Sequence, residues 1–466
     1  MNKKKTNTLV KRIVQNARKA QEKFQYYSQE RVDRIVTAIA WSICNPKNNL
    51  MLSQLAVKST RLGNVKDKII KNQRKTLGLL RDLKNVKSTG VIFEDKKKGI
   101  IEIAKPIGII GAITPSTNPI ATPINNIINA IKCKNSIILS PSPSGHKVLK
   151  KLISFLNKEL SKIKAPKNLI QTFNVPITKE ITQELMKQVD KIIVTGSQNN
   201  VREATVSGTP NIGVGVGNVT VIVDNNVNFK DVISKIKSSK IFDNATSCSS
   251  ENNVIILKKS QKIFKKLISK NGGVILNNTQ KQNLRKSLWN KGKLNRNLIG
   301  KSAKEILILS NLKVKTNINS SEFIVVNEKG VGNKYPFSGE KLSPIMSLYV
   351  AKDFSNAKLI AKKILNFQGA GHSIGIHSKD KKKILDLGLN FPVCRVIVNQ
   401  AHTFATGGSF TNGLPFSLSM GCGTWQKNSI DENLNYRHFM NITKISRPIK
   451  GKEPKLKEFF KNYLES

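Results

Sequence analysis

Cysteine and long apolar runs are both scarce in this chain. Only five cysteines occur among 466 residues, and no two form a Cys-x-x-Cys pair, so neither a disulfide framework nor a thiolate metal site is expected. The longest clean apolar stretch, 107–113, is far shorter than the ~20 residues that span a bilayer. No apolar segment of a secretory signal follows the basic residues 1–5. We therefore expect a cytoplasmic protein that has no membrane segment and binds no metal.

Acidic and aromatic residues are also few. The chain has 29 Asp and Glu against 79 Lys and Arg, a formal net charge of +50, and only 6% of its residues are aromatic. A large positive charge can indicate nucleic-acid binding, and it also attracts small polyanions such as nucleotides. Readers of nucleic acids concentrate arginine and aromatic side chains on one face, whereas the lysines here are spread along the whole chain. We interpret them as solvated surface and expect no nucleic-acid partner.

Neither the G-x-G-x-x-G fingerprint nor the Walker A motif occurs, so two common nucleotide-binding signatures are missing. The chain does show short β-branched runs that alternate with amphipathic helical segments. This alternation predicts an α/β fold built on a doubly wound parallel sheet. The runs expected to form strands are 107–113, 136–139, 191–194 and 219–223, followed after a change of spacing by 254–257, 305–309, 323–326, 346–350, 374–376 and 396–398.

The change of spacing predicts three parts of the chain. Residues 1–241 are expected to form a first α/β domain, with two helices within 6–45 and a hairpin at 91–104. Residues 242–415 are expected to form a second α/β domain. Residues 416–466 are expected to return to the first domain and to end in a basic helical tail.

Two cysteines lie where a reactive thiol can form. Cys248 lies in a polar, turn-prone stretch directly after a predicted helix, and Cys422 lies between two glycines. A cysteine in a loop of small residues can be accessible and close to backbone N–H groups that lower its pKa, as a thiolate nucleophile requires. A buried, inert thiol is the commoner state of any single cysteine, and no local feature separates these two.

Small polar residues follow three predicted strands in succession, at 114–119, 140–143 and 195–197. Ligands of open α/β sheets bind at the carboxyl ends of the strands. The last of these turns opens a helix, whose free N–H groups can hold a phosphate. Asn118 offers a side-chain amide that can stabilise an oxyanion, although an Asn-Pro pair is also an ordinary turn.

Two further segments are rich in glycine. Residues 213–218 alternate Gly with Val, which indicates close approach of the backbone to a ligand or to a neighbouring strand. His372, within Gly-Ala-Gly-His-Ser, has the most site-like surroundings of the five histidines. A lone histidine between small residues is more often structural than catalytic.

In this order, these segments resemble the aldehyde dehydrogenase superfamily, specifically its coenzyme A-acylating branch. The resemblance runs from about residue 20 to residue 448, and each motif alone is weak. The matching segments are Ala20-Gln21, Ser28 to Asp33, Lys105 to Ile110, Thr114 to Pro119, Leu139 to Pro141, Val194 to Gly196, Gly213 to Val219, Ser239 to Asn244 with Cys248, Glu340 to Pro344, and Gly369 to His377.

The resemblance implies a role for each matched residue. Cys248 would attack an aldehyde carbonyl, and Asn118 with the backbone N–H of Cys248 would form the oxyanion hole. Glu340 would hold the ribose beside the nicotinamide of NADP or NAD, and the product would be a thioester on Cys248. Residues 1–241 would bind the cofactor and 242–415 would carry the nucleophile. The other residues expected to bind the cofactor are Thr114, Pro115, Ser116, Thr117, Ser140, Pro141, Ser142, Gly196, Ser197 and Gly215.

Release of the thioester distinguishes the branches of this superfamily. Hydrolytic members carry a glutamate general base just before their glycine-rich segment, and the alignment places Gly213 at that position. Without a carboxylate there, water is poorly activated. The thioester is then expected to persist until the thiol of the co-substrate coenzyme A attacks it, and this attack gives an acyl-CoA. His372 matches a histidine of the acylating branch and is expected to assist.

The choice of nicotinamide cofactor depends on the turn after residues 136–139. Hydrolytic relatives often place a lysine at the position of Ser140, with an acidic residue near it that disfavours the 2′-phosphate of NADP. Here serines leave room, and His146 and Lys147 are close enough to favour NADP. The alternative is that these two residues simply begin a surface helix.

The stretch 399–425 resembles the acylating sulfoacetaldehyde dehydrogenases more than the acetaldehyde-specific enzymes. His402 and Thr403 are expected to present donors to an anionic sulfonate, unless the loop merely shapes a pocket for any short aldehyde. Many members carry glycine after the tryptophan at 425, whereas this chain has Gln426-Lys427. Acetaldehyde, succinate semialdehyde and a hydrolytic reaction to a free acid remain alternatives. The 91–104 hairpin and the tail resemble intersubunit arms, so a dimer or tetramer is expected.

Overall fold

Four helices open the chain in the computed structural model, which describes residues 3–314 and 317–464. They are α1 (Lys3–Phe24), α2 (Gln29–Cys44), α3 (Pro46–Thr60) and α4 (Val65–Leu83). Side-chain oxygens of Ser28, Asn45 and Asn64 accept N–H groups in the first turns of α2, α3 and α4, which fixes where these helices begin. The expected pair of helices within 6–45 is confirmed as α1 and α2.

The first sheet has five parallel strands in the order β5-β4-β3-β6-β7. Helices α1, α7 and α8 cover one face, and α2, α5 and α6 cover the other. The chain order reverses between β3 and β6, so their carboxyl ends form the switch point at which such sheets bind ligands. The elements are β3 (Ile109–Thr114), α5 (Ala121–Lys132), β4 (Ser136–Pro141), α6 (His146–Lys162), β5 (Ile170–Thr172), α7 (Lys179–Gln188), β6 (Lys191–Val194), α8 (Gln198–Val206) and β7 (Asn211–Gly213).

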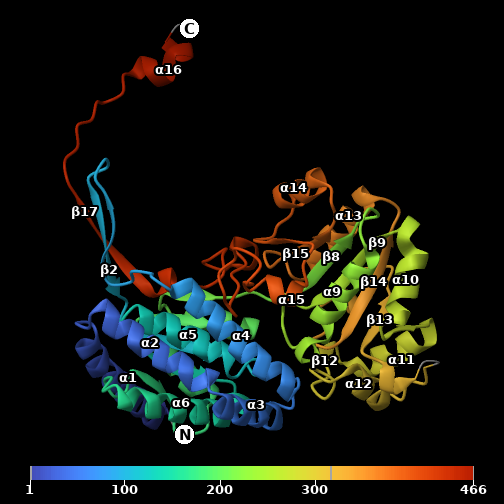
Figure 1. The fold of residues 1–466 in the computed structure, drawn as a ribbon, viewed down its shortest axis with the longest axis horizontal. Coiled ribbons are helices and arrows are strands. Elements are labelled where there is room, and N and C mark those ends of the chain that lie inside the picture. Colours follow the sequence, from blue (N-terminus) through green and yellow to red (C-terminus); the bar gives the residue numbers. More distant parts are fainter. Residues whose placement is uncertain (1–2, 315–316, 465–466) are drawn as a thin grey trace.

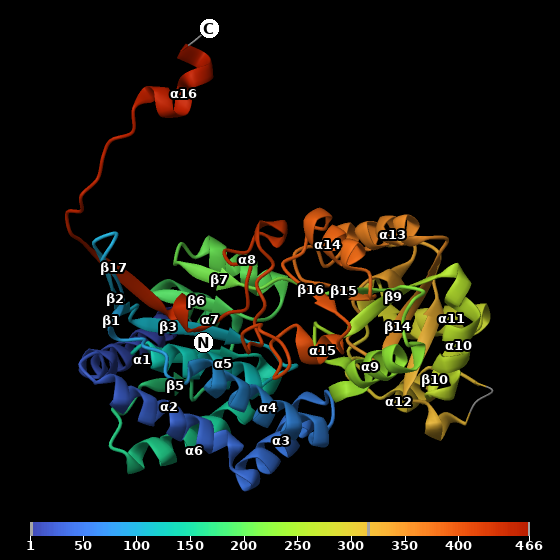
Figure 2. The ribbon, with the colours of Figure 1, turned by 45° about the horizontal axis from the view of Figure 1, so that its top comes forward.

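The second sheet has seven parallel strands in the order β10-β13-β14-β9-β8-β15-β16. Helices α9 and α10 pack on one face and α13 and α14 on the other, and α11 and α12 pack at the β10 end. The two sheets lie side by side in Figures 1 and 2. The elements are β8 (Val219–Val223), α9 (Phe229–Ile241), β9 (Glu251–Leu257), α10 (Gln261–Lys270), β10 (Gly273–Leu276), α11 (Asn278–Leu288), β11 (Trp289–Asn290), β12 (Lys293–Leu294), α12 (Ala303–Leu309), β13 (Phe323–Asn327), β14 (Ile345–Ala351), α13 (Phe354–Phe367), β15 (Ile374–His377), α14 (Lys381–Asn390) and β16 (Val396–Val398).

Two expectations from the sequence are wrong. The run 305–309 forms helix α12, because Ser302 and Glu305 complete a capping box and the following apolar residues bury a helical face against β10 and β13. The run 219–223 was expected in the first sheet, but as β8 it pairs with β9 and β15 of the second sheet. The sheet boundary therefore lies between residues 213 and 219 rather than at 241. Periodicity finds a strand but does not say which neighbour it pairs with.

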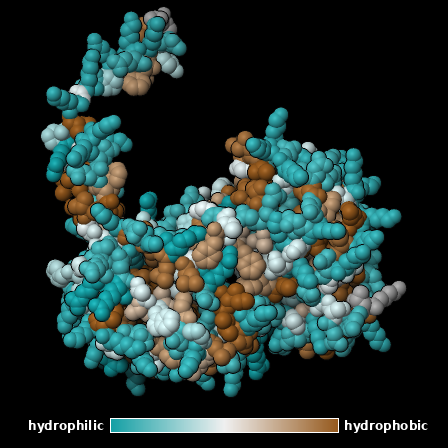
Figure 3. Space-filling view, viewed as in Figure 1, coloured by the Kyte–Doolittle hydropathy of each residue, from teal (hydrophilic) through white to brown (hydrophobic). Residues whose placement is uncertain are grey.

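An arm projects from the first sheet. Strands β1 (Gly90–Asp95), β2 (Ile100–Pro106) and β17 (Met440–Ser446) form an antiparallel three-stranded sheet, which confirms both the hairpin and the return of the C-terminal part. The chain then extends away from the body and ends in α16 (Leu456–Leu464) (Figure 1). Apolar side chains stay exposed along the arm and tail, among them Phe93, Ile445 and Phe459 (Figure 3).

Candidate active site

The carboxyl ends of β4, β3 and β6 form one continuous edge, which we call the cofactor edge (residues 114–117, 140–142 and 195–197). The Ser142 N–H donates to the Thr114 carbonyl oxygen (3.0 Å), and the Thr195 N–H donates to the Ile113 carbonyl oxygen (3.0 Å). Ser197 caps α8. The hydroxyl oxygens of Thr114 and Ser142 are buried and have no hydrogen-bond partner among residues 3–314 and 317–464, a state that buried polar groups rarely keep unless a ligand completes them.

The turn before Cys248 is held in an unusual backbone conformation. Three successive residues, Asp243, Asn244 and Ala245, have positive φ angles of 49°, 52° and 56°, which costs energy for residues other than glycine. The buried carboxylate of Asp243 offsets this cost, because it accepts hydrogen bonds from Lys71 Nζ (2.5 Å), Lys68 Nζ (3.0 Å), Thr246 Oγ1 (2.8 Å) and the Asn64 N–H (3.0 Å). These bonds fasten the cysteine loop to α4.

The same lysine connects the cysteine loop to Asn118. Lys71 Nζ donates to Asn118 Oδ1 at 2.9 Å, as well as to Asp243. With its oxygen occupied by a cation, the Asn118 amide keeps both N–H bonds for another acceptor. The structure thus joins the expected oxyanion donor and the loop of the expected nucleophile through one side chain.

The glycine segment 213–218 packs directly on the cysteine loop. A Cβ added at Gly217 would lie 2.2 Å from the Cys248 carbonyl oxygen, and one added at Gly215 would lie 2.3 Å from Gln426 Oε1. Gln426 also accepts from the Val216 N–H (2.7 Å) and donates to the Val216 carbonyl oxygen (2.9 Å). Gln426, at a departure from the family pattern, therefore holds the segment in place. Gly213 faces Val201 instead, where a Cβ would lie 2.4 Å from its Cγ1.

Burial separates the two candidate cysteines. Cys248 is half-buried, whereas Cys422 is fully buried, so Cys248 is the one that a substrate can reach. Burial and the nearby Glu340 carboxylate raise the pKa of the Cys248 thiol to about 12, and Ser249 and Arg395 partly offset this. Burial also raises the pKa of Glu340 to about 8. The thiol is therefore protonated at neutral pH until a proton acceptor or a bound cation favours the thiolate.

A hydrogen-bonded relay lies behind His372. His372 Nδ1 bonds Ser373 Oγ (2.8 Å), which bonds His402 Nε2 (2.9 Å). Burial, together with the cation of Arg395, lowers the pKa of His372 to about 3, so the imidazole is neutral. Its Nε2 is buried and has no partner within the described residues. The neutral imidazole therefore has one ring nitrogen left for another partner, and its low pKa makes it a weak base.

Several known proteins are similar to this chain in sequence and in fold. A profile of the aldehyde dehydrogenase family matches residues 2–285. The acylating sulfoacetaldehyde dehydrogenase of Cupriavidus necator is 47% identical over 452 residues, which cover 97% of this chain and 92% of that protein. An acetylating aldehyde dehydrogenase from Geobacillus thermoglucosidasius is 32% identical with a TM-score of 0.92, covering 97% of this chain and 99% of that one. The chain belongs to the aldehyde dehydrogenase family.

A further solved aldehyde dehydrogenase that is similar to this chain was determined with a ligand and a modified cysteine. The propionaldehyde dehydrogenase of Rhodopseudomonas palustris, with bound coenzyme A and an acylated cysteine, has a TM-score of 0.83 at 25% identity, covering 94% of this chain and 97% of that one. The resemblance inferred from the sequence is therefore confirmed, and this aldehyde dehydrogenase is an oxidoreductase that acts on aldehyde groups. Within residues 3–314 and 317–464, no helix combines the length and apolar character that a membrane crossing requires.

Two residues expected to contact the substrate, His402 and Thr403, have partners within the chain. The Nε2 atom of His402 bonds Ser373, and its backbone N–H donates to Glu251. The Thr403 backbone N–H and hydroxyl both donate to Ser239 (2.8 and 3.2 Å). Both side chains are buried and have these partners, and their contact with a sulfonate stays a prediction. They begin the short helix α15 (His402–Ala405) that packs on α9.

Several residues of the site were not foreseen from the sequence. Lys68, Lys71 and Arg395 look like three of many lysines and arginines, yet all three are buried. Arg395 donates to the carbonyl oxygens of His372 and Gly421 (2.9 Å each) and to Asn433 (2.8 Å), which orders the His372 segment. The helical spacing of the α4 lysines was the one available signal, since it places them on a single face.

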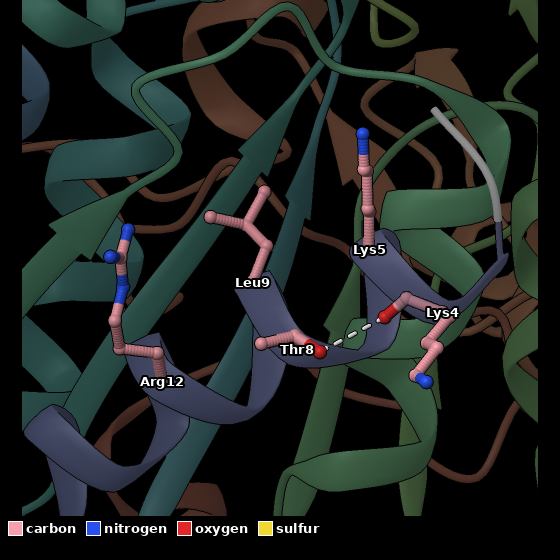
Figure 4. Close-up of a pocket in the computed structure, with 5 residues that line it drawn as sticks. All are labelled: Lys4, Lys5, Thr8, Leu9 and Arg12. Atoms are coloured by element: carbon pink, nitrogen blue, oxygen red, sulfur yellow. Dashed lines mark hydrogen bonds between the residues drawn. The ribbon is translucent and has the colours of Figure 1, made fainter.

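A surface hollow on α1 lacks the reactive and orphaned polar groups that mark the candidate active site. It has a volume of about 400 Å³ and is lined by Lys4, Lys5, Thr8, Leu9 and Arg12 (Figure 4). The bond drawn there, from Thr8 Oγ1 to the Lys4 carbonyl oxygen, is an ordinary helical contact of 3.0 Å. With no nucleophile, acid or orphaned polar atom among its lining residues, this hollow is not a candidate for the chemistry.

Proposed function

We propose that this chain oxidises a short anionic aldehyde, with sulfoacetaldehyde as the favoured substrate, to an acyl-CoA through a thioester on Cys248. The observation that carries this proposal is the bridge from Asp243 through Lys71 to Asn118, which sets an amide donor beside the loop of the half-buried cysteine. The activities named for the Cupriavidus and Rhodopseudomonas relatives supply the substrate and co-substrate classes.

The first half-reaction uses Cys248 and Asn118. The Cys248 sulfur attacks the aldehyde carbon, and the thiol proton passes to the carbonyl oxygen, which gives a thiohemiacetal. The Asn118 amide and the Cys248 backbone N–H donate to the oxygen as it gains negative charge. A bound nicotinamide supplies the hydride acceptor for oxidation at that carbon. The chain's own role is to hold the acyl group as a thioester on the sulfur.

Residues of the cofactor edge fit a nicotinamide dinucleotide. The orphaned hydroxyls of Thr114 and Ser142 point to a ligand there, and the N-terminus of α8 at Gly196 and Ser197 suits a phosphate. We assign the same site to Pro115, Ser116, Thr117, Ser140, Pro141 and Gly215, and the ribose to Glu340. Exposed Lys147 favours NADP over NAD, whereas the His146 ring is already bonded to the Phe173 carbonyl oxygen (2.8 Å).

The second half-reaction uses His372. The coenzyme A sulfur attacks the thioester carbon while its proton passes to the free Nε2, because the low pKa of His372 does not allow the thiolate to form beforehand. The Cys248 sulfur leaves as a thiolate and is reprotonated, which releases the acyl-CoA. Gly213 offers no carboxylate for water, and the packing of Val201 against it leaves no space for one. The preference for a thiol therefore rests on the missing carboxylate at 213 and on what surrounds Cys248.

The wider organisation follows the same proposal. The first sheet with its helices is assigned to the cofactor and the second sheet with the cysteine loop to catalysis. The exposed apolar strip of the β1-β2-β17 arm is assigned to a second copy of the chain, in a dimer or tetramer. Five free thiols suit the reducing cytoplasm.

Dependence of turnover on coenzyme A tests this function. Reduction of NAD or NADP by sulfoacetaldehyde should require coenzyme A and yield its acyl thioester in equal amount. Equal turnover without coenzyme A, with a free acid as product, would refute the proposal. The variant Glu340→Gln sharpens the test, because Glu340 is the carboxylate in electrostatic contact with Cys248. Because Glu340 is also assigned to the ribose, the variant is assayed at saturating cofactor. Loss of acid formation with retained formation of the acyl thioester would identify Glu340 as the group that activates water.

A further inference from the structure

One face of α4 carries a row of cations toward the active site. Lys68, Lys71 and Lys75 follow at helical spacing, with Arg74 beside them. Lys71 reaches both Asp243 and Asn118, so this face lies against the cysteine loop and the oxyanion donor. Lys75 interacts electrostatically with the Cys248 thiolate as well as with Lys71. The row of cations therefore extends from Asn118 and Asp243 to within electrostatic reach of Cys248.

Not all of these cations have a counter-ion. The Asp243 carboxylate pairs with Lys68 and Lys71. Within residues 3–314 and 317–464, no carboxylate lies within ion-pair distance of Arg74 or Lys75. Their hydrogen bonds are to neutral oxygens: Arg74 Nη2 donates to Ser409 Oγ (3.1 Å) and Lys75 Nζ to the Gly407 carbonyl oxygen (2.6 Å). Arg74 Nε is buried and has no partner in that part of the chain.

Aromatic rings surround the two unpaired cations. The Arg74 guanidinium lies 5.6 Å from the ring centre of Phe404 and 5.3 Å from that of Phe410, and Lys75 Nζ lies 5.4 Å from that of Phe416. Phe404 packs on Phe242, at the start of the cysteine loop (4.7 Å between ring centres). Removing water from unpaired charges is costly, and aromatic rings repay only part of it. The arrangement is therefore completed by an anion.

We propose that Arg74 and Lys75 bind the anionic end of the aldehyde substrate, a sulfonate or carboxylate one or two carbons from the carbonyl. This inference rests on the proposed function and names the residues that select its substrate class. The free Arg74 Nε and the remaining N–H bonds of Lys75 are donors suited to the several oxygens of such a group. Arg74 and Lys75 would thereby add two cationic donors to the contacts expected of His402 and Thr403.

A comparison of two aldehydes of similar size tests the proposal. The full chain is assayed with coenzyme A on sulfoacetaldehyde and on propionaldehyde, and the ratio of the two kcat/KM values is recorded. This ratio does not depend on the fraction of folded enzyme. Because a hydrogen bond to a charged group contributes about 1.5–3 kcal/mol, Arg74→Gln and Lys75→Gln should each lower the ratio by about tenfold or more. Succinate semialdehyde in place of sulfoacetaldehyde shows whether a carboxylate is accepted.

The matched control is Lys66→Gln, which removes the same charge from an exposed position of α4. It should leave the ratio within about twofold of the wild type. An equal fall in the control, or an unchanged ratio in both site variants, would overturn the subsite. If the site variants fail to fold, inhibition of the wild type decides. Ethanesulfonate should compete with sulfoacetaldehyde, and lack of competition would refute the proposal.

The two proposals fail in distinguishable ways. Absence of coenzyme A-dependent turnover with every aldehyde would refute the proposed function. Coenzyme A-dependent turnover with no preference for the charged aldehyde would leave that function intact and refute the role of Arg74 and Lys75 alone.

Discussion

The cofactor edge and the α4 face (Lys68, Lys71, Arg74 and Lys75) belong to different elements and differ in the size and charge of their side chains. The cofactor edge consists of small, neutral residues at strand ends, with orphaned hydroxyls at Thr114 and Ser142. The α4 face consists of long cationic side chains, of which only Lys68 and Lys71 pair with the buried Asp243 carboxylate. Small residues leave space for a large cofactor, whereas fixed charges select and orient a small substrate. The following predictions test this contrast.

Removal of the Cys248 sulfur is expected to lower kcat more than any other change. The variant Cys248→Ala should lower kcat by at least about 10⁴-fold, as removal of other catalytic nucleophiles does. Cys44→Ala, at a half-buried position on α2, is the matched control and should retain turnover. Comparable losses in both variants would mean that the thiols act through stability and not through chemistry.

The α4 face comes next. Lys71→Met should lower kcat by about 100-fold, because Asn118 loses the partner that directs its amide toward the oxyanion. Asn118→Ala should cause a loss of similar size, and the double variant should be little worse than either single one. Fully additive losses in this double-mutant cycle would contradict the positioning role of Lys71. Lys71→Arg, which keeps the charge, should recover part of the rate.

The relay behind His372 should affect only the second half-reaction. Ser373→Ala removes the hydroxyl between His372 and His402, and the rate of acyl transfer to coenzyme A should fall by about tenfold, part of a general base contribution. The first burst of cofactor reduction should keep its rate. A slower burst in rapid-mixing measurements would show that the relay acts before the thioester forms.

The unpaired lysine predicts a pH dependence. Burial and the neighbouring Arg74 and Lys71 cations lower the pKa of Lys75 to about 7, while Cys248 and Asp82 oppose this shift. The ammonium is charged below that pKa and neutral above it. The KM for sulfoacetaldehyde, relative to that for propionaldehyde, should therefore rise about fivefold between about pH 6 and about pH 8. Lys75→Gln should remove this rise, and its persistence would assign the titration elsewhere.

The cofactor edge should give the smallest effect. Thr114→Val removes one orphaned hydroxyl, and it should raise the KM for the nicotinamide cofactor by about threefold to tenfold, the contribution of one neutral hydrogen bond. The KM for the aldehyde should stay the same. A change confined to the aldehyde KM would place Thr114 on the other side of the site.

The contrast also explains what could be predicted from the sequence. Strand-end residues such as Thr114 and Ser142 were identified because a β-branched run followed by small polar residues is a local signal. The parallel sheets and the arm followed from the same periodicity. Lys71 and Arg74 were missed because a buried lysine and a surface lysine look alike in a chain with 79 basic residues. The contact between His402 and Ser373 could not be predicted, because the two residues are distant in sequence.

The fate of the acyl group on Cys248 tests the central claim most directly. The enzyme, NADP or NAD and sulfoacetaldehyde are mixed without coenzyme A, and the intact mass of the protein is followed. The account predicts an adduct on Cys248 that persists in water and disappears when coenzyme A is added, with an equal amount of acyl-CoA formed. Rapid loss of the adduct as free acid before coenzyme A is added would contradict it.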